Sequence, residues 1–161
     1  MTVLNVGMGE LQVSKMPGVS LVSPGLGSCI GLIMYDPLYK IGGMVHIVLP
    51  DSSVCTKQAL PGKYADTAVP ELLKKMSELG AKKHNLIVKI AGGAQMFNLE
   101  KGCNILNIGM RNVIAVKAAL SKESININAA DTGGNKGRTV KLDVATGVVL
   151  IKAIGQQEIQ L

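Results

Sequence analysis

Cys29 and His46 are the two residues of this chain whose types and spacing are best suited to chemistry. Cys29 directly follows the glycine-rich segment SPGLGS, and His46 lies in the next apolar stretch. A thiol beside an imidazole can pass its proton to the ring and become a nucleophilic thiolate. The pair could therefore attack a carbonyl carbon, provided that the fold brings the two side chains together.

Two short apolar stretches, residues 29–35 and 44–49, are expected to position this pair. Both are rich in β-forming residues, and the turn-forming residues 36–40 separate them. Apolar stretches of this length, bounded by turn residues, are typical of strands that are buried on both faces. The short connection predicts that the two strands form an antiparallel hairpin.

The register of this hairpin decides whether the thiol meets the imidazole. We place the centre of the turn between Pro37 and Leu38. Cys29 then directly faces His46, with the two Cβ atoms about 4.5–5.5 Å apart. A shift of one residue would turn a whole set of side chains to the other face of the sheet. The glycines at 42–43 could hold a β-bulge that causes such a shift.

The residues before Cys29 suit the other needs of a nucleophile. Gly27 allows the backbone to approach a ligand closely, and the amide groups around Ser28 and Cys29 could donate to a developing oxyanion. A catalytic imidazole is usually oriented by a third group. Ser23 carries the nearest hydroxyl outside the glycine-rich loop and could bond the far nitrogen of His46.

A structural role for both residues is the alternative. Free cysteine is often a small buried hydrophobe, and a single histidine in an apolar strand is more often part of the core than of a site. The combination of a glycine-rich loop, a cysteine at a strand start and a histidine in the next strand is more informative than either residue alone. From spacing, both interpretations stay open.

The segments GLGSC, YDP, KIGGMVH and LP are followed, in order, by a helical region at 64–80 and by GAKK, KIAGGAQMF, IGMRN and DTGGNKGR. This ordered set resembles the CheD family of chemotaxis proteins, which are chemoreceptor glutamine deamidases. The resemblance covers residues 5 to 152. It implies hydrolysis of particular glutamine side chains in methyl-accepting receptors, which yields glutamate and ammonia.

The resemblance also assigns roles to single residues. Cys29 matches the family's nucleophile and His46 its general base. Ser23 stands where members carry a threonine as the third catalytic residue, so the hydroxyl is kept and the methyl group that restricts its rotamer is lost. Met110 stands where the family often has an acidic residue. The resemblance implies no metal or organic cofactor, and it implies the phosphatase CheC as a second partner beside the receptors.

Two other functions remain open. The chain could be a non-catalytic chemotaxis adaptor that binds a receptor or CheC and keeps Cys29 for packing. It could also be a general cysteine peptidase, because the same thiol and imidazole would serve that reaction.

Size and composition predict one domain with an aliphatic core. The chain has 161 residues, of which 47% are hydrophobic and only 2% aromatic. We expect a deamidase-like domain over residues 1–155 and a frayed tail over 156–161. No apolar stretch reaches the roughly 18 residues of a membrane span, and the N-terminal residues lack the features of a secretory signal. These observations predict a cytoplasmic protein that is not inserted in a membrane.

Charge and cysteine content narrow the partners. The net charge of +6 is explained by solubility or by steering toward an acidic partner surface. Nucleic acid is not an expected partner, because the lysines are scattered and aromatic residues for base stacking are nearly absent. The other cysteines, Cys55 and Cys103, lack metal-ligand spacing and are interpreted as incidental.

The order of expected elements is strands, helix, strand, helix, strands. It predicts an α+β single-domain layered sandwich with a mixed, largely antiparallel sheet and two main helices. The resemblance implies a fold similar to that of glutamine-deamidating toxins. We expect helices at 66–79, with Thr67 as cap and Gly80 as stop, and at 109–120. Expected strands lie at 3–13, 20–23, 86–91, 125–129, 139–144 and 148–152.

Overall fold

The computed structural model describes residues 1–53, 59–96 and 107–161. Cys55 and Cys103 lie outside these ranges, so the expectations for them stay untested. The strands are β1 (Thr2–Asn5), β2 (Leu11–Ser14), β3 (Val19–Leu26), β4 (Ile30–Asp36), β5 (Ile41–Ile47), β6 (Ile87–Gly92), β7 (Ala129–Thr132), β8 (Arg138–Asp143), β9 (Val149–Ala153) and β10 (Ile159–Gln160). The helices are α1 (Ala65–Glu78) and α2 (Ile108–Lys122), with 3-10 turns at Pro61–Lys63 and Lys83–Asn85.

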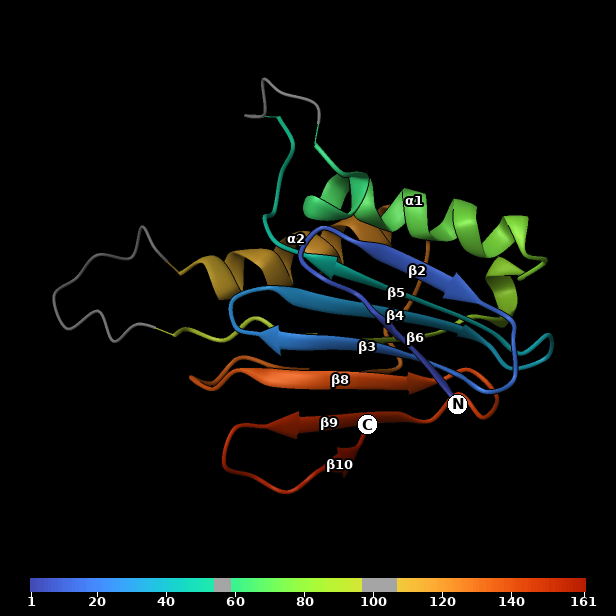
Figure 1. Ribbon diagram of the computed structural model, residues 1–161. Coiled ribbons are helices and arrows are strands. Elements are labelled where there is room, and N and C mark those ends of the chain that lie inside the picture. The colour runs from blue at the N-terminus through green and yellow to red at the C-terminus, as the bar shows by residue number, and fades with distance from the viewer. Residues whose placement is uncertain (54–58, 97–106) are drawn as a thin grey trace, which may run out of the picture.

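The elements form three layers (Figure 1). One mixed sheet has the strand order β1-β3-β8-β9-β10, and a second has the order β2-β5-β4-β6-β7. Helices α1 and α2 lie together on the outer face of the second sheet. The expected α+β layered sandwich is confirmed. The structure divides its strands between two packed sheets, where the sequence pattern suggested one.

Strand β4 supplies side chains to both cores. Ile30, Leu32 and Met34 pack under the helices, whereas Ile33 and Tyr35 pack between the two sheets. Every residue of β4 and β5 is buried, which explains why their sequences are continuously apolar rather than alternating. The site residues lie at the end of this doubly covered hairpin.

The hairpin is antiparallel, as expected, but its predicted register was wrong. Gly31 faces His46, so Cys29 does not face it directly. The cause is the turn: Asp36 accepts hydrogen bonds from the amides of Leu38 and Tyr39, and the loop spans residues 37–40. The error is two residues in pairing, and because side chains alternate with a period of two, Cys29 stays on the face of His46.

The N-terminal segment expected as one strand is two strands in different sheets. β1 pairs in parallel with β3, and β2 pairs antiparallel with β5. Gly9, with φ of +75°, lies in the turn between them, and its amide donates to the carbonyl of His46. The turn therefore carries the chain from one sheet to the other beside the histidine.

Both expected helices are present, with different caps. The residue before α1 is Tyr64, and the hydroxyl of Thr67 donates to the carbonyls of Pro61 and Tyr64, so the predicted Thr67 cap was wrong. Gly80 ends α1 with φ of +107°, as expected. Asn107 caps α2, its side-chain oxygen accepting from the amide of Met110.

Residues 156–161, where the sequence predicts a frayed tail, include a short strand. Ile159 and Gln160 form β10, which pairs with β9, and the Lys89 ammonium donates to the carbonyl of Leu161. Strand β9 would otherwise be an edge with unpaired backbone groups, which the tail covers. Across the described ranges, no helix is long and apolar enough to span a membrane.

Candidate active site

Ser23 and His46 meet between the two sheets. The Oγ of Ser23 lies 2.9 Å from Nδ1 of His46 and 3.0 Å from the carbonyl oxygen of Val6. That same carbonyl is 3.3 Å from Nδ1. Both side chains are buried. The contact that the sequence predicted between this hydroxyl and the imidazole is thus present, and Val6 adds a second partner.

These contacts determine which ring nitrogen of His46 carries the proton. The Val6 carbonyl can only accept, and the Ser23 hydroxyl donates to it, so the hydroxyl oxygen is free to accept from Nδ1–H. The proton therefore sits on Nδ1. Nε2 is left with a lone pair, and it has no hydrogen-bond partner within the part of the chain that the structure describes. A buried imidazole with one open acceptor nitrogen is suited to take a proton.

Cys29 lies just before β4, next to the last pair of the hairpin ladder. Ile30 faces Ile47 there, and alternation puts Cys29 on the inter-sheet face, where it packs in the same cluster as Met44. It is a diagonal neighbour of His46, a relation in which Cα atoms are about 7–8 Å apart. Cys29 is a free thiol, 9% exposed.

The protonation of the resting pair follows from burial. Desolvation raises the pKa of the Cys29 thiol, and a hydrogen bond from its own backbone amide opposes this. Desolvation also lowers the pKa of His46, against the bond to Val6 and the charge of Glu10, which raise it. Both effects favour neutral forms. The two shifts therefore favour a neutral thiol beside a neutral imidazole in the free protein.

The segment before Cys29 is fastened by its carbonyl groups. The carbonyl of Gly27 accepts from the amide of Ala94, and that of Cys29 accepts from Gly93. The amides of Ser28 and Cys29 donate to no other residue among those described. The predicted oxyanion donors therefore bond no other described residue, while the carbonyl groups of Gly27 and Cys29 are held.

Glycines at the end of β6 permit this fastening. A Cβ on Gly92 would lie 2.1 Å from the carbonyl oxygen of Cys29, and the φ of Gly92 is +111°. A side chain there would push the Cys29 segment away. The glycine pair therefore brings β6 directly against the backbone of the candidate nucleophile.

Sequence analysis missed two residues that contact the site. The Val6 carbonyl bonds both Ser23 and His46, but any residue type could supply a carbonyl, so no signal marked it. Asn112 is buried in α2 and donates to the carbonyls of Ser28 and Val48. Its signal was available: a polar amide on the inner face of an otherwise apolar helix, within the segment IGMRN.

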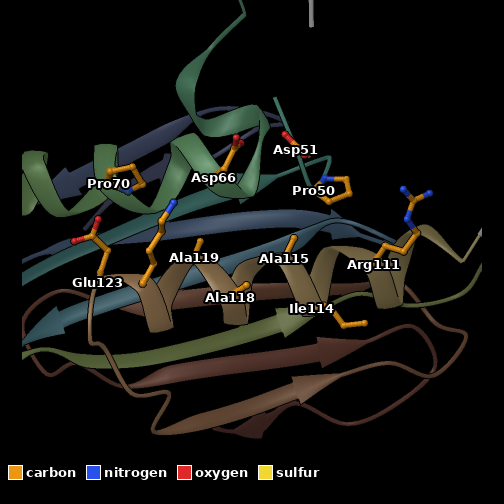
Figure 2. A pocket seen from close by; sticks show the side chains of 11 residues that line it. Pro50, Asp51, Asp66, Pro70, Arg111, Ile114, Ala115, Ala118, Ala119 and Glu123 are labelled. Atoms are coloured by element: carbon orange, nitrogen blue, oxygen red, sulfur yellow. The ribbon is translucent and has the colours of Figure 1, made fainter. Parts of the chain in front are cut away.

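A cavity of about 760 Å³ lies elsewhere, between the two helices (Figure 2). Asp66 and Pro70 of α1 face Ala115 and Ala119 of α2, and Glu123 directly after it, across this cavity. None of Ser23, Cys29 and His46 lines it. The volume of this cavity therefore says nothing about the thiol chemistry.

Comparisons with known proteins place the chain in one family. Residues 48–153 match the family described as CheD chemotactic sensory transduction. The chain is similar to a protein of Symbiobacterium thermophilum, named "Probable chemoreceptor glutamine deamidase CheD", with 48% identity over 97% of this chain and 95% of that protein. A protein of Clostridium botulinum strain Hall with the same name is 48% identical over 94% of this chain and 93% of its own length.

The relatives extend the match beyond the family segment. That segment begins at residue 48, after Ser23, Cys29 and His46, whereas the similarity to the relatives spans nearly the whole chain. The order of motifs, the fold and these matches agree. The chain belongs to the CheD family of chemotaxis proteins.

Proposed function

We propose that this protein is a glutamine deamidase that hydrolyses side-chain amides of methyl-accepting chemoreceptors to glutamate and ammonia. The names of the relatives support the reaction and the substrate. The observation that carries the mechanism is the state of the His46 ring, whose Nδ1 is bound by Ser23 and Val6 while Nε2 is open. This is the arrangement required of a general base.

The first half of the reaction forms a thioester. Nε2 of His46 takes the proton of the Cys29 thiol as the sulfur attacks the carbonyl carbon of the glutamine side chain. The resulting tetrahedral intermediate collapses when the imidazolium returns that proton to the amide nitrogen, the C–N bond breaks and ammonia leaves. Proton and electron pair balance, and His46 is neutral again.

The second half releases the acid. His46 takes a proton from a water molecule as that water attacks the thioester carbon. The C–S bond breaks, the sulfur takes the proton back from the imidazolium, and glutamate remains on the receptor. Ser23 stabilises both imidazolium stages by holding the ring in one orientation. Its hydroxyl accepts from Nδ1–H throughout.

The amides of Gly27, Ser28 and Cys29 are our candidates for oxyanion donors. Those of Ser28 and Cys29 donate to no other residue among those described. Hydrogen-bond donors that are already oriented toward the oxyanion are most effective where water is excluded. Cys29 is only 9% exposed, which meets that condition. We further propose that the enzyme acts in the cytoplasm on the cytoplasmic region of receptors, and that CheC binds it.

Two rival functions are separated by simple variants. A non-catalytic adaptor would keep its biological effect in the Cys29→Ala protein, because the sulfur would serve only packing. A general cysteine peptidase would cut the receptor chain, whereas a deamidase releases ammonia from an intact chain.

The direct test is mass spectrometry of a receptor cytoplasmic fragment incubated with the protein. Conversion of an amide to an acid adds about one dalton at a glutamine. We expect this gain with the wild-type protein, together with ammonia, and expect it to be absent with Cys29→Ala and His46→Ala. Deamidation that survives either substitution would overturn the proposed mechanism. No mass change with any receptor fragment of the host would overturn the proposed function.

A further inference from the structure

Asn112 bridges two backbone segments that meet at the candidate nucleophile. It lies in the second turn of α2, and its side chain is fully buried, with 0% exposure. Its Nδ2 is 2.9 Å from the carbonyl oxygen of Ser28 and 3.0 Å from that of Val48. Ser28 precedes Cys29, and Val48 follows His46 by two residues. One amide group thus joins both halves of the site.

Chemistry fixes the orientation of this amide. Both neighbours are carbonyl oxygens, which only accept, so the NH₂ group must face them. The Oδ1 of Asn112 then points away and has no hydrogen-bond partner within the described ranges. Leaving a buried carbonyl unpaired costs about 1–3 kcal/mol. An apolar residue would avoid that cost but would leave the carbonyls of Ser28 and Val48 without this donor, so the asparagine accepts one unpaired oxygen in order to tie these two segments together.

The hydrogen bonds of Asn112 lie just beyond the end of the β4–β5 ladder. The ladder of β4 and β5 ends with Ile30 facing Ile47, and the next pair would be Cys29 and Val48. At that position the backbone groups bond outward: the carbonyl of Cys29 accepts from Gly93, and the amide of Val48 donates to Lys63. No backbone bond therefore joins Cys29 to Val48. The side chain of Asn112 supplies a bond between the two segments just beyond the ladder.

Helix α2 is itself held firmly at this point. A Cβ on Gly109 would lie 2.4 Å from the carbonyl oxygen of Ala94 and 2.5 Å from that of Gly93. The first turn of the helix therefore rests directly on the backbone that fastens Gly27 and Cys29. Because the helix is held here, the side-chain amide of Asn112 has little freedom to follow movements of the Ser28 segment. The amide instead sets the position of that segment.

We propose that Asn112 is a positioning residue, which fixes the distance between the Cys29 loop and the end of β5 and so keeps the sulfur in reach of His46. This inference rests on the proposed thiol–imidazole mechanism. Asn112 touches neither the sulfur nor the ring, and it acts through the carbonyls of Ser28 and Val48. Loss of its two hydrogen bonds releases the Ser28 segment and exposes the sulfur.

Asn112→Ala removes both donors, and Asn128→Ala is the matched control. Asn128 accepts from the amide of Val88, near the other end of β6.

Misplacement of a reacting group by about 1 Å lowers rates about 100-fold. We expect Asn112→Ala to lower kcat by that order with little change in KM. Alkylation of Cys29 at pH 7 should become faster, its pH midpoint moving toward the free-thiol value of about 8.5. The control should change neither.

A lower kcat for deamidation together with faster alkylation of Cys29 identifies a positioning role. If Asn112→Ala does not fold, Asn112→Gln keeps the amide one methylene out of place and should show the same pattern with a smaller loss. Unchanged kcat and unchanged alkylation in a folded Asn112 variant would overturn the inference. If the wild-type protein deamidates nothing, the proposed function fails, but the alkylation comparison still decides whether Asn112 holds the loop.

Discussion

The Oγ of Ser23 lies 2.9 Å from Nδ1 of His46 while it donates to the carbonyl of Val6. One hydroxyl therefore fixes both the tautomer and the direction of the imidazole. The contact joins the two sheets, because Ser23 belongs to β3 and His46 to β5. The orientation of the candidate base thus depends on how the sheets pack.

Ser23→Ala tests this relationship. The variant leaves Nδ1–H with only the Val6 carbonyl, 3.3 Å away, so the ring is oriented less well. General base catalysis contributes about 10²–10⁴-fold, and we expect kcat for glutamine deamidation to fall by about the lower of these factors. Ser23→Thr keeps the hydroxyl and should retain most of the activity. Ammonia release measures both.

Ser20→Ala is the matched control, because Ser20 is also buried in β3 and its hydroxyl donates to the sulfur of Met1, away from the imidazole. It should lose no activity. Equal losses in the two alanine variants would show that the effect comes from strand packing rather than from the imidazole.

The pH dependence of Cys29 alkylation tests the protonation of the resting pair. Burial raises the pKa of the Cys29 thiol and lowers the pKa of His46, so the thiolate should appear only above the free-thiol value of about 8.5. Iodoacetamide labelling from pH 6 to 10, followed by peptide mapping of Cys29, measures this. A midpoint below 7 that rises in His46→Ala would mean that the ion pair exists before substrate binds.

Asp36 should make the protein sensitive to acid. Burial raises the pKa of this carboxyl, but hydrogen bonds from the amides of Lys82, Tyr39 and Leu38 and from Asn85 outweigh it and hold the pKa below 3.8. A group whose pKa is lower in the folded state contributes stability above its unfolded pKa, and that contribution is lost as pH falls through the folded value. The free energy of unfolding should therefore decrease below about pH 4.

Asp36→Asn is the variant that tests this, by urea unfolding at pH 7 and pH 3. Its NH₂ group would face a donor, since Lys82 donates to Oδ2, and we expect a cost of about 1–3 kcal/mol at pH 7. The loss between the two pH values should be smaller than in the wild type. Asp51→Asn, at an exposed carboxyl, should leave the pH dependence unchanged. The same slope in wild type and Asp36→Asn would contradict the prediction.

Gly109→Ala tests the contact between α2 and the backbone near the site. Alanine normally stabilises a helix by about 0.5–1 kcal/mol relative to glycine. Here the added Cβ would lie 2.4 Å from a carbonyl oxygen, so we expect the opposite sign, a destabilisation of about 1–3 kcal/mol, together with lower kcat. Thermal unfolding and ammonia release measure the two effects.

Gly137→Ala provides the comparison for stability, because its nearest neighbour would be 3.6 Å away. It should change the unfolding temperature little. A Gly109→Ala protein that is more stable than the wild type would show that α2 can move outward without cost.

The sequence predicted the elements whose patterns are set locally. β4 and β5 are continuously apolar because both faces are covered, and Gly80 ends α1 because it adopts a positive φ. The register could not be predicted, since it depends on hydrogen bonds to the Asp36 side chain. Strand β7, expected at 125–129, lies at Ala129–Thr132 because its place is set by pairing with β6.

The candidate site was also predictable only in part. Ser23, Cys29 and His46 could be selected from residue type and spacing, and Cys29 and His46 stay on one face of the sheet because the register error was two residues. The residues that hold these side chains in place could not be predicted. Asn112 is 84 positions from Ser28, and the protonation of the pair depends on burial, which no local pattern contains.

The distribution of strands between the two sheets has a practical consequence for protein engineering. Each sheet combines strands from before residue 48 with strands from after it: β1 and β3 join β8–β10, and β2, β4 and β5 join β6 and β7. A recombinant piece limited to residues 48–153 would expose the bare edges of β6 and β8, which invites aggregation. Two separately produced pieces, each insoluble alone, would be expected to recover a folded protein only when they are made together.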